Sequence, residues 1–448
     1  MNIVRLGLST AISSALLLSS SANAAPPRPG DYLVASRTHG WIISVDPRTG
    51  IAGTVLTGPD AFDPADPPAL IGAGPDLGPS FRLSIDSATG GAILARTCLN
   101  PAKTWGLFDV DAFNGDRTRL PGSESTLWDE CGDIIFNDTD TIYATASGDY
   151  ETSPDDRGRV IHFDLNTHAS TLISGDARGD GLGMISPRAL ARLDASTLLV
   201  LEVNIPTGVG AGLFKIDLVS GDRTLLSWIT RGARERRMIV NGADTCPVTI
   251  GDDEGGAGPQ VNRQTRAVCV TPDGRILVGA ASEFGSFFAG AILEIDPETG
   301  DRTLLLGDAI DQNTGQHLIV PPSNDPDFGR LQAPMGLLNT PGGRVAFTEL
   351  FGAGRLLELD PATGALAVVA DIPAQIAATN SQLSGLAIYW PDYNPGDLAP
   401  PFGVFNFDDV LAFLVAFGAM DPIADSAPPL GTFNFDDVLA FLTAFTEG

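Results

Sequence analysis

The sequence has 448 residues, with 55 acidic against 27 basic side chains and a formal net charge of −28. So acidic a balance argues against nucleic acid or an anionic membrane surface as the main partner, since both need basic patches. A hydrophobic content of 43% excludes wholesale disorder, and the 51 glycines and 33 prolines disfavour a mostly helical protein.

The first residues predict export. Arg5 is followed by the apolar run Ala11–Leu18, and the small residues Ala22 and Ala24 form a cleavage site before Ala25. This run is too short for a stable membrane anchor, and no later stretch reaches about 18 consecutive apolar residues. We therefore expect residues 1–24 to be a signal peptide and the mature chain to be secreted or held at the cell surface, without a transmembrane segment. An uncleaved membrane helix is the alternative.

Four cysteines in an exported chain predict two disulfides. Three connectivities are open to them. We favour Cys98–Cys131 and Cys246–Cys269 because these partners are neighbours in sequence and lie near predicted strand ends. The alternative is four buried thiols.

A repeat organises residues 30–393. Its unit is an apolar strand that ends in Asp, a glycine-containing turn, and a second apolar strand that often begins with Arg-Thr. The anchoring aspartates are Asp46, Asp109 or Asp111, Asp164, Asp217, Asp296 and Asp360. A repeat with this period indicates a propeller or a solenoid, and Asp-Pro-x-Thr-Gly suits a tight turn.

Each of these hairpins is preceded by a further strand–turn–strand pattern, except the first. Four strands per unit are typical of a propeller blade. Complete units begin near residues 81, 133, 188, 266 and 335. Residues 31–57 supply only three strands, and the missing inner strand is found at 383–390. The sequence therefore predicts an all-β, six-bladed β-propeller whose first blade is split between the two ends of the repeat region. A seven-bladed ring would need residues 58–79 or 230–262 as an irregular blade.

The tail, residues 394–448, is a separate duplicated module with eight acidic residues and no lysine or arginine. Asn406-x-x-Asp409 and Asn434-x-x-Asp437 each precede an apolar stripe at helical spacing. We expect two short helices that cover each other only in part. Their aromatic side chains would then form a partner-binding surface, made of Phe413, Phe417, Phe441 and Phe445.

The duplicated loop and helix resemble the dockerin repeat, and their amino-acid sequence is most similar to that of the GC-type dockerin modules of exported planctomycete-type bacterial proteins. The resemblance is confined to the tail. It implies docking to another protein and two calcium loops with ligands at Asp397, Asn406, Asp409, Asp425, Asn434 and Asp437. Ala399 and Pro401 in the first copy fall where a dockerin has ligands, so a metal-free helix pair is the alternative.

The propeller region contains no nucleophile elbow, phosphate loop or dinucleotide fingerprint, and its four histidines are not spaced as metal ligands. Six-bladed propellers include calcium-dependent lactonases, which place carboxylates and amides near the starts of inner strands. The candidates for such a site are Asp129, Glu130, Gln332 and Asn380, with Glu202, Asn204 and Glu349 on second strands.

Three arginines fall at the same entrance of three predicted inner strands: Arg82, Arg188 and Arg266. Converging guanidinium groups suit an anionic ligand, because arginine pairs with carboxylates through two bonds. The alternative is local pairing with aspartates such as Asp86 or Asp194. The tripeptide Arg178-Gly179-Asp180 matches an adhesion motif, which a loop rich in glycine and aspartate also produces by chance.

These features favour an exported binding or scaffold protein rather than an enzyme. Its propeller would bind an anionic small molecule or a glycan, and its tail would bind an extracellular or cell-surface protein, with calcium as the one cofactor implied. The alternative is a calcium-dependent lactonase, a sugar-lactone hydrolase or a lyase built on the propeller.

Overall fold

The protein is described here from a computed structural model. The described residues are 27, 30–36, 41–57, 73, 81–85, 92–99, 104–111, 115–123, 126–128, 131–138, 140–147, 158–203, 211–230, 234–240, 243–250, 255–261, 265–284, 287–321, 330–340, 343–349, 354–372, 383–389, 398, 406–418, 424 and 433–447. Side chains are not described at 53–57, 81, 92–99, 104–105, 126, 131, 234–250, 282–289 and 447. The predicted signal peptide lies outside this part of the chain.

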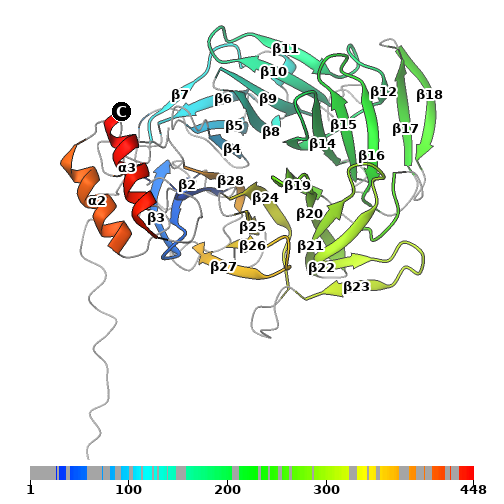
Figure 1. The fold of residues 1–448 in the computed structure, drawn as a ribbon. Helices are drawn as coiled ribbons and strands as arrows, with labels where there is room; N and C mark the ends of the chain where they lie inside the picture. Colours follow the sequence, from blue (N-terminus) through cyan, green and yellow to red (C-terminus); the bar gives the residue numbers. More distant parts are fainter. Residues whose placement is uncertain are drawn as a thin grey trace, which may run out of the picture.

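The described strands form six sheets, which we number along the chain and which are antiparallel except for one short pair in sheet 4 (Figure 1). Sheet 1 is ordered β28 (Leu383–Ile388), β1 (Tyr32–Ser36), β2 (Trp41–Asp46), β3 (Ile51–Thr57). Sheet 2 is β4 (Phe81–Ile85), β5 (Ala92–Leu99), β6 (Thr104–Val110), β7 (Arg117–Arg119). Sheet 3 is β8 (Cys131–Asp138), β9 (Thr141–Ala146), β10 (Arg159–Asp164), β11 (Ser170–Ser174). A 3-10 turn, η1 (Thr126–Trp128), precedes β8.

The other three sheets continue the series. Sheet 4 is ordered β13 (Pro187–Arg192), β14 (Thr197–Val203), β15 (Ala211–Asp217), β16 (Arg223–Trp228), β12 (Gly181–Leu182), β17 (Arg234–Val240), β18 (Ala243–Ile250). Sheet 5 is β19 (Thr265–Val270), β20 (Ile276–Phe284), β21 (Phe287–Ile295), β22 (Arg302–Ile310), β23 (His317–Val320). Sheet 6 is β24 (Pro334–Asn339), β25 (Val345–Glu349), β26 (Arg355–Leu359), β27 (Leu366–Asp371).

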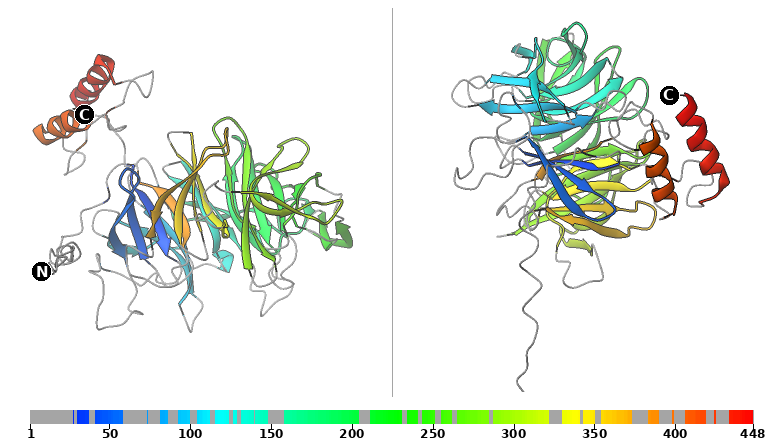
Figure 2. Two further views of the ribbon diagram at one scale, coloured as in Figure 1. Left: turned by 90° about the horizontal axis from the view of Figure 1, so that it is seen from below. Right: turned by 90° about the vertical axis from the view of Figure 1, so that its left-hand side faces the viewer.

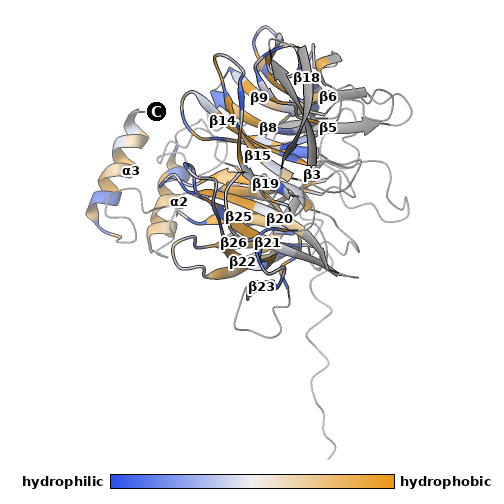
Figure 3. Ribbon diagram, turned by 90° about the vertical axis from the view of Figure 1, so that its right-hand side faces the viewer, coloured by the Kyte–Doolittle hydropathy of each residue, from blue (hydrophilic) through white to orange (hydrophobic). Residues whose placement is uncertain are grey.

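The sheets are arranged around a central axis, as the predicted propeller requires. Their inner strands touch one another in a closed cycle, β28 to β4, β8, β13, β19, β24 and back to β28. The predicted pairing of the two ends of the repeat region is present, since β1 pairs on one side with β2 and on the other with β28. Hydrophobic residues concentrate in the strands and hydrophilic ones in the turns (Figure 3), so each sheet buries apolar side chains against its neighbours.

Two sheets depart from the predicted four strands. In sheet 5, β23 adds a fifth strand. In sheet 4, the short β12 pairs in parallel with β16 and antiparallel with β17, which attaches the β17–β18 hairpin to the outer edge. Residues 234–250 therefore extend sheet 4 rather than form an irregular blade of their own. Backbone hydrogen bonds join the two ends of the segment that carries this hairpin. Trp228 N–H donates to the Gly255 carbonyl at 2.9 Å, and Val261 N–H donates to the Ile229 carbonyl at 3.0 Å.

The anchoring aspartates act as predicted turn residues. The Oδ1 atom of Asp217 accepts the N–H groups of Val219 and Ser220, and Asp296 accepts those of Glu298 and Thr299. These N–H donors hold the pKa of both carboxyls below the ordinary value. In sheet 2 the turn residue is Asp111 rather than Asp109, because its carbonyl accepts the Gly115 N–H and its own N–H donates to Asp116.

Two buried arginines hold sheets 3, 4 and 5 together. Arg223 donates through Nε to the Leu182 carbonyl and through Nη1 to Ser174 Oγ and the Gly175 carbonyl. Arg302 repeats the arrangement one sheet further on, with acceptors at the Pro259 carbonyl, Ser227 Oγ and the Gly255 carbonyl. We call this arrangement the arginine clasp. It supplies charged donors to carbonyls of the preceding loop that would otherwise be buried without partners.

The aspartate before each clasp arginine accepts a hydrogen bond from the backbone of the same loop. Asp222 Oδ1 accepts the Asp180 N–H, and Asp301 Oδ1 accepts the Ala257 N–H, both at 2.7 Å. Asp180 and Ala257, which donate these bonds, each lie between two glycines with positive φ. A Cβ at Gly179 would lie 1.9 Å from the Gly221 carbonyl oxygen, so only glycine permits this approach. The tripeptide Arg178-Gly179-Asp180 therefore has a structural role in the clasp.

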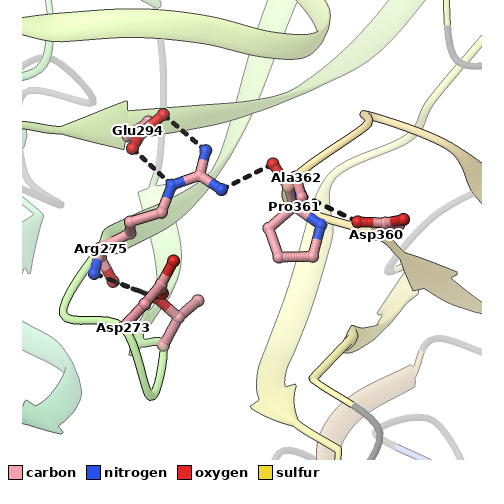
Figure 4. Close-up of polar contacts among 7 residues, drawn as sticks. Asp273, Arg275, Glu294, Asp360, Pro361 and Ala362 are labelled. Atoms are coloured by element: carbon pink, nitrogen blue, oxygen red, sulfur yellow. Dashed lines mark hydrogen bonds and ion pairs between the residues drawn. The ribbon is translucent and has the colours of Figure 1, made fainter.

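Other seams use a basic side chain and a turn carbonyl. Arg275 of sheet 5 forms a two-bond ion pair with Glu294, at 2.6 and 2.7 Å, and its Nη1 donates to the Pro361 carbonyl in a turn of sheet 6 (Figure 4). Lys215 of sheet 4 donates in the same way to the Pro297 carbonyl of sheet 5. The Asp-Pro turns thus contribute acceptors to the preceding sheet.

The C-terminal residues form two helices, α2 (Phe407–Gly418) and α3 (Phe435–Glu447), beside the propeller (Figure 2). They contact each other through Phe413 and Phe441, whose stacked ring centroids are 4.1 Å apart. Neither helix, nor any other in the part of the chain that the structure describes, is long and apolar enough to cross a membrane.

The predicted Cys246–Cys269 disulfide is wrong. Cys269 is a buried thiol, and burial raises its pKa to about 12. It lies in β19, the inner strand of sheet 5, whereas Cys246 lies in β18 at the outer edge of sheet 4, and a disulfide requires Cα atoms within about 7 Å. No disulfide is present among the described side chains. Those of Cys98 and Cys131 lie outside that set.

Candidate functional site

A cavity of about 420 Å³ lies in the central channel. All six inner strands contribute to its lining, which includes the apolar residues Leu83, Ile134, Leu190, Val268, Leu337 and Leu386. Polar side chains interrupt these walls, namely Arg82, Ser84, Asp133, Arg266, Asn339 and Thr340. A concave site that combines apolar walls with polar groups is a usual form of a small-molecule site.

Arg82 extends across one end of the channel. Its Nε donates to the Gly132 carbonyl at 3.2 Å, its Nη1 to the Ser384 carbonyl at 2.5 Å and its Nη2 to the Arg266 carbonyl at 2.8 Å. Each acceptor is the second residue of an inner strand, and β19, which carries Arg266, lies opposite β4 in the ring. The guanidinium therefore ties four inner strands together at the end where they begin.

Asp133 lies beside this arginine. Its Oδ1 is 4.0 Å from Arg82 Nε, and its Oδ2 accepts the N–H of Leu190 from the next inner strand at 3.0 Å. Burial raises the pKa of the Asp133 carboxyl, and this effect exceeds the opposing effects of Arg82 and the Leu190 N–H. A titratable group with a shifted pKa in the wall of a cavity is a candidate functional residue.

The three arginines predicted at one channel mouth do lie at the same end of their inner strands. Arg82 and Arg266 line the cavity. Arg188 lies next to Gly132, where a Cβ would be 3.1 Å from the Arg188 Cα. The bonds from Arg82 run to main-chain carbonyls on other strands, however, so this side chain also has a structural role that spacing did not reveal.

Two of the predicted lactonase-type residues come together in sheet 6. The buried Glu349 accepts the Gln332 N–H at 2.9 Å and forms a two-bond ion pair with Arg355, at 2.7 and 2.8 Å. Burial raises the pKa of Glu349 against the effect of Arg355. The neighbouring Ala333 has φ of 36°, a strained value for a residue with a side chain.

The remaining candidates do not join this group. Glu202 is fully buried at the end of β14 in sheet 4, while Asp129, Glu130, Asn204 and Asn380 lie outside the described residues. Among the residues that are described, no three His, Cys, Asp or Glu side chains are grouped in a way that could hold a metal ion.

In the tail, the predicted calcium ligands Asn406, Asp409, Asn434 and Asp437 form two capping boxes. Asn406 Oδ1 accepts the Asp408 N–H, and Asp409 Oδ2 accepts the Asn406 N–H. The second copy repeats these bonds, and Asp409 Oδ1 also accepts the Leu398 N–H at 2.8 Å. These oxygens face backbone donors at a helix start, an arrangement that does not fit a shared cation. Asp397 and Asp425 lie outside the described residues.

The four tail phenylalanines form the interior of the helix pair. Phe413 and Phe441 are each 1% exposed, and Phe417 and Phe445 pack against them. The exposed apolar side chains occupy other positions of the two copies: Phe407, Leu411, Leu414 and Val415 on α2, and Phe435, Leu439 and Leu442 on α3. A partner that bound the folded pair would therefore contact this second set.

Sequence reasoning missed Asn339 at the end of β24. Its Nδ2 donates to the Val270 carbonyl at 2.5 Å, while its buried Oδ1 has no hydrogen-bond partner among the described residues. The residue lines the cavity. Its place at the end of an inner strand, before the turn that begins at Thr340, was the only sequence signal.

No protein-family model matches this sequence, and no curated protein matches it either. Solved structures resemble its fold. TolB from Acinetobacter baumannii is 12% identical with a TM-score of 0.45, and the match covers 80% of this chain and 66% of that one, just under two thirds. A protein of unknown function from Bacteroides caccae is 10% identical with a TM-score of 0.44, covering 80% and 98%. We base no argument on these likenesses; the strand topology itself gives an all-β propeller with two short C-terminal helices.

Proposed function

We propose that the chain is an exported binding protein whose propeller holds a small molecule in its central channel. The observation that carries the proposal is the cavity of about 420 Å³, to which all six inner strands contribute. We take the six sheets to be six blades of a ring closed by the β1–β28 pairing. Export rests on the signal-like residues 1–24, as in the planctomycete-type proteins that the tail resembles.

Filling the cavity tests this proposal. The full chain is titrated with 2-naphthol, whose fluorescence reports its surroundings. We expect binding of one equivalent, weakened at least about 10-fold in Ser84→Trp, because Ser84 lines the cavity and its side chain is only half-buried, so an indole there would occupy part of the cavity. Val219→Trp, on a side chain 81% exposed, is the matched control. Equal affinity for all three proteins would contradict a site in the channel.

For the tail we propose a dockerin-like, metal-free helix pair that binds a protein outside the cell. The exposed apolar side chains of α2 and α3 support a docking face. Since residues 394–448 carry eight acidic and no basic residues, charge complementarity favours a partner with a basic rim around an apolar groove, and disfavours a second copy.

Charged substitutions among the exposed apolar side chains of α2 and α3, which we call the docking face, test whether the tail binds a partner. Leu411→Glu with Leu439→Glu should reduce the cell-associated fraction of the exported protein, while Val219→Glu on the propeller should not. The helix content of the double variant, followed by circular dichroism, shows that the pair remains folded. An unchanged cell-associated fraction with intact helices would contradict docking through this face.

An enzyme is the second candidate, favoured by the Glu349 cluster. Its support is the raised pKa of a buried carboxyl beside Arg355 and the strained Ala333. A calcium-dependent lactonase or a lyase would show turnover of a sugar lactone or of an acidic polysaccharide, lost in Glu349→Gln. Absence of turnover by the full chain with calcium added would leave binding as the function.

A further inference from the structure

We infer that the central cavity is closed where the inner strands begin and open where they end, so that an amphipathic ligand enters it with its polar group first. This inference rests on the proposed function, since it assumes that the cavity binds a small molecule. It adds the class of ligand, a molecule with a polar group at one end and an apolar remainder, and the face of the ring through which that ligand passes.

Arg82 closes the first end of the channel. Its guanidinium donates to the carbonyls of Gly132, Ser384 and Arg266 on three other inner strands, and one of these strands, β19, lies opposite β4 in the ring. The Arg82 side chain is only 12% exposed, so solvent scarcely reaches it. A ligand that approached from this side would have to break these hydrogen bonds before it reached the cavity.

The burial of the inner strands changes from one end to the other. The first residue is buried in every inner strand where its side chain is described, namely Pro187, Thr265, Pro334 and Leu383. The last residue is half-buried or exposed in all six: Ile85, Asp138, Arg192, Val270, Asn339 and Ile388. Solvent therefore reaches the inner strands mainly where they end, and the entrance to the cavity lies at that end.

The two ends of the cavity also differ in chemistry. All three charged residues of its lining, Arg82, Asp133 and Arg266, lie within the first three residues of their strands. Toward the entrance the lining is uncharged and mostly aliphatic: Ile85, Ile135, Leu338 and Ile388, with Asn339 and Thr340. The closed end can interact with a polar or charged group, and the half-buried aliphatic side chains gain from being covered by an apolar one. This order favours a ligand whose polar group lies innermost.

A larger side chain at the entrance tests the route. Stopped-flow fluorescence follows the binding of 2-naphthol to the full chain. We expect Ile85→Trp to lower the association and dissociation rate constants together, each at least about 10-fold, with little change in the dissociation constant. Ile388→Trp, on the neighbouring inner strand, repeats the test should Ile85→Trp fail to fold. Ile319→Trp, on a side chain 59% exposed in the outer strand β23, is the matched control.

Removal of the arginine tests the closed end. Arg82→Ala combined with Ile85→Trp should open a second entrance, so the association rate constant should return to within about 3-fold of the wild-type value. Circular dichroism shows whether the double variant is folded. A folded double variant that bound as slowly as Ile85→Trp would show that Arg82 does not close the channel.

Two isomeric probes test the orientation of the ligand. The butyl tail of 6-butyl-2-naphthol points away from the hydroxyl group, whereas that of 1-butyl-2-naphthol lies beside it. We expect the 6-butyl isomer to bind at least about 10-fold more tightly, because its tail can lie at the aliphatic entrance while its hydroxyl group reaches the closed end.

The outcomes distinguish the inference from the proposed function. Unchanged rate constants in a folded entrance variant, or equal affinity for the two isomers, would overturn the inference, while weaker binding of 2-naphthol to Ser84→Trp would still support a site in the channel. If 2-naphthol did not bind the wild-type protein, the proposed function would fall together with the inference.

Discussion

The seams around sheet 4 and the seam between sheets 6 and 1 hold neighbouring sheets together by different means. Arg223 and Arg302 fix loops that lie within about 50 residues of them in sequence. At the other seam no clasp arginine follows the turn of residues 360–364. There Tyr32 donates to Glu358 at 2.6 Å across a separation of 326 residues, and β28, which pairs with β1 inside sheet 1, contacts β24 of sheet 6.

This difference indicates how the ring is assembled. The bonds of the arginine clasp join residues that are close in sequence, so they can form as soon as the two neighbouring sheets have folded. The contacts that close sheet 1 are long-range and must await the C-terminal strand, and non-local contacts slow folding. The ring should therefore be most sensitive at its closure, and four changes test this ranking from the largest expected effect to the smallest.

Deletion of residues 383–393 should have the largest effect. It removes β28 with the buried Leu383 and Leu386, and it removes the Ser384 carbonyl that Arg82 uses. We expect a loss of more than about 5 kcal/mol in the free energy of unfolding, measured by denaturant unfolding. Deletion of 397–448 is the control and should leave the propeller transition nearly unchanged. Similar transitions for both deletions would contradict the importance of closure.

Arg302→Ala should destabilise the protein by about 4 kcal/mol, because it leaves the Pro259 and Gly255 carbonyls without their charged donor. Arg302→Lys should recover only part of this loss, since lysine lacks the planar fork. Arg48→Ala, which removes an exposed pair with Asp46, should cost less than about 1 kcal/mol. A small effect at Arg302 in urea unfolding would show that the clasp is dispensable.

Two glycine variants separate the effect of the close contact between Gly179 and Gly221 from the effect of positive φ. Gly179 and Gly274 have similar positive φ, +82° and +87°, but a Cβ at Gly274 meets nothing within 4 Å. Gly179→Ala should cost about 3 kcal/mol, and Gly274→Ala only the backbone cost of about 1 kcal/mol. Thermal unfolding of both variants gives the comparison. Equal losses would mean that φ alone, and not contact with Gly221, requires glycine at 179.

The smallest effect is expected for Tyr32→Phe, which removes one hydroxyl group and leaves the β1–β28 pairing intact. Loss of the bond to Glu358 should cost about 1 kcal/mol at neutral pH. Burial, together with Glu358, raises the pKa of Tyr32. Above pH about 10 the unfolded tyrosine ionises while the folded one keeps its proton, so the advantage of wild type over Tyr32→Phe is complete below that pH and decreases above it. Unfolding titrations at neutral and alkaline pH measure the difference, and a pH-independent difference would contradict the shifted pKa.

The strands and turns of the propeller could be predicted because their signals are local. Alternating apolar residues and Asp-centred turns give inner strands that begin within two residues of the predicted positions. The strand predicted at 383–390 to complete the first sheet is β28 (Leu383–Ile388), which pairs with β1. The β17–β18 hairpin and β23 were missed, since strand patterns at the edge of a sheet do not reveal which sheet they join. Cys246–Cys269 failed because sequence proximity does not report whether a strand is inner or outer.

The candidate site was less predictable than the fold. The spacing of Arg82 and Arg266 placed both at the same end of the channel, but their bonds depend on which strand lies opposite which. Asn339 carried no distinguishing pattern. Two further local signals were present in the sequence. Asn-x-x-Asp before an apolar run is also a helix capping box, and glycines on both sides of Ala257 indicate close backbone approach.

The two ends of the segment that carries the β17–β18 hairpin are fixed, and this determines where a ring of this kind can accept inserted residues. The chain leaves the outer strand β16 of the four-stranded part of sheet 4 after Thr230, forms the β17–β18 hairpin, and comes back beside β16 at Gly255. Both ends of this segment are held by backbone bonds, and Gly255 also by the Arg302 clasp. Added length between fixed ends costs little chain entropy. This place is therefore a natural insertion point, where a peptide or a whole domain could be grafted without altering the registry of the ring, and where divergence among proteins of this architecture should accumulate.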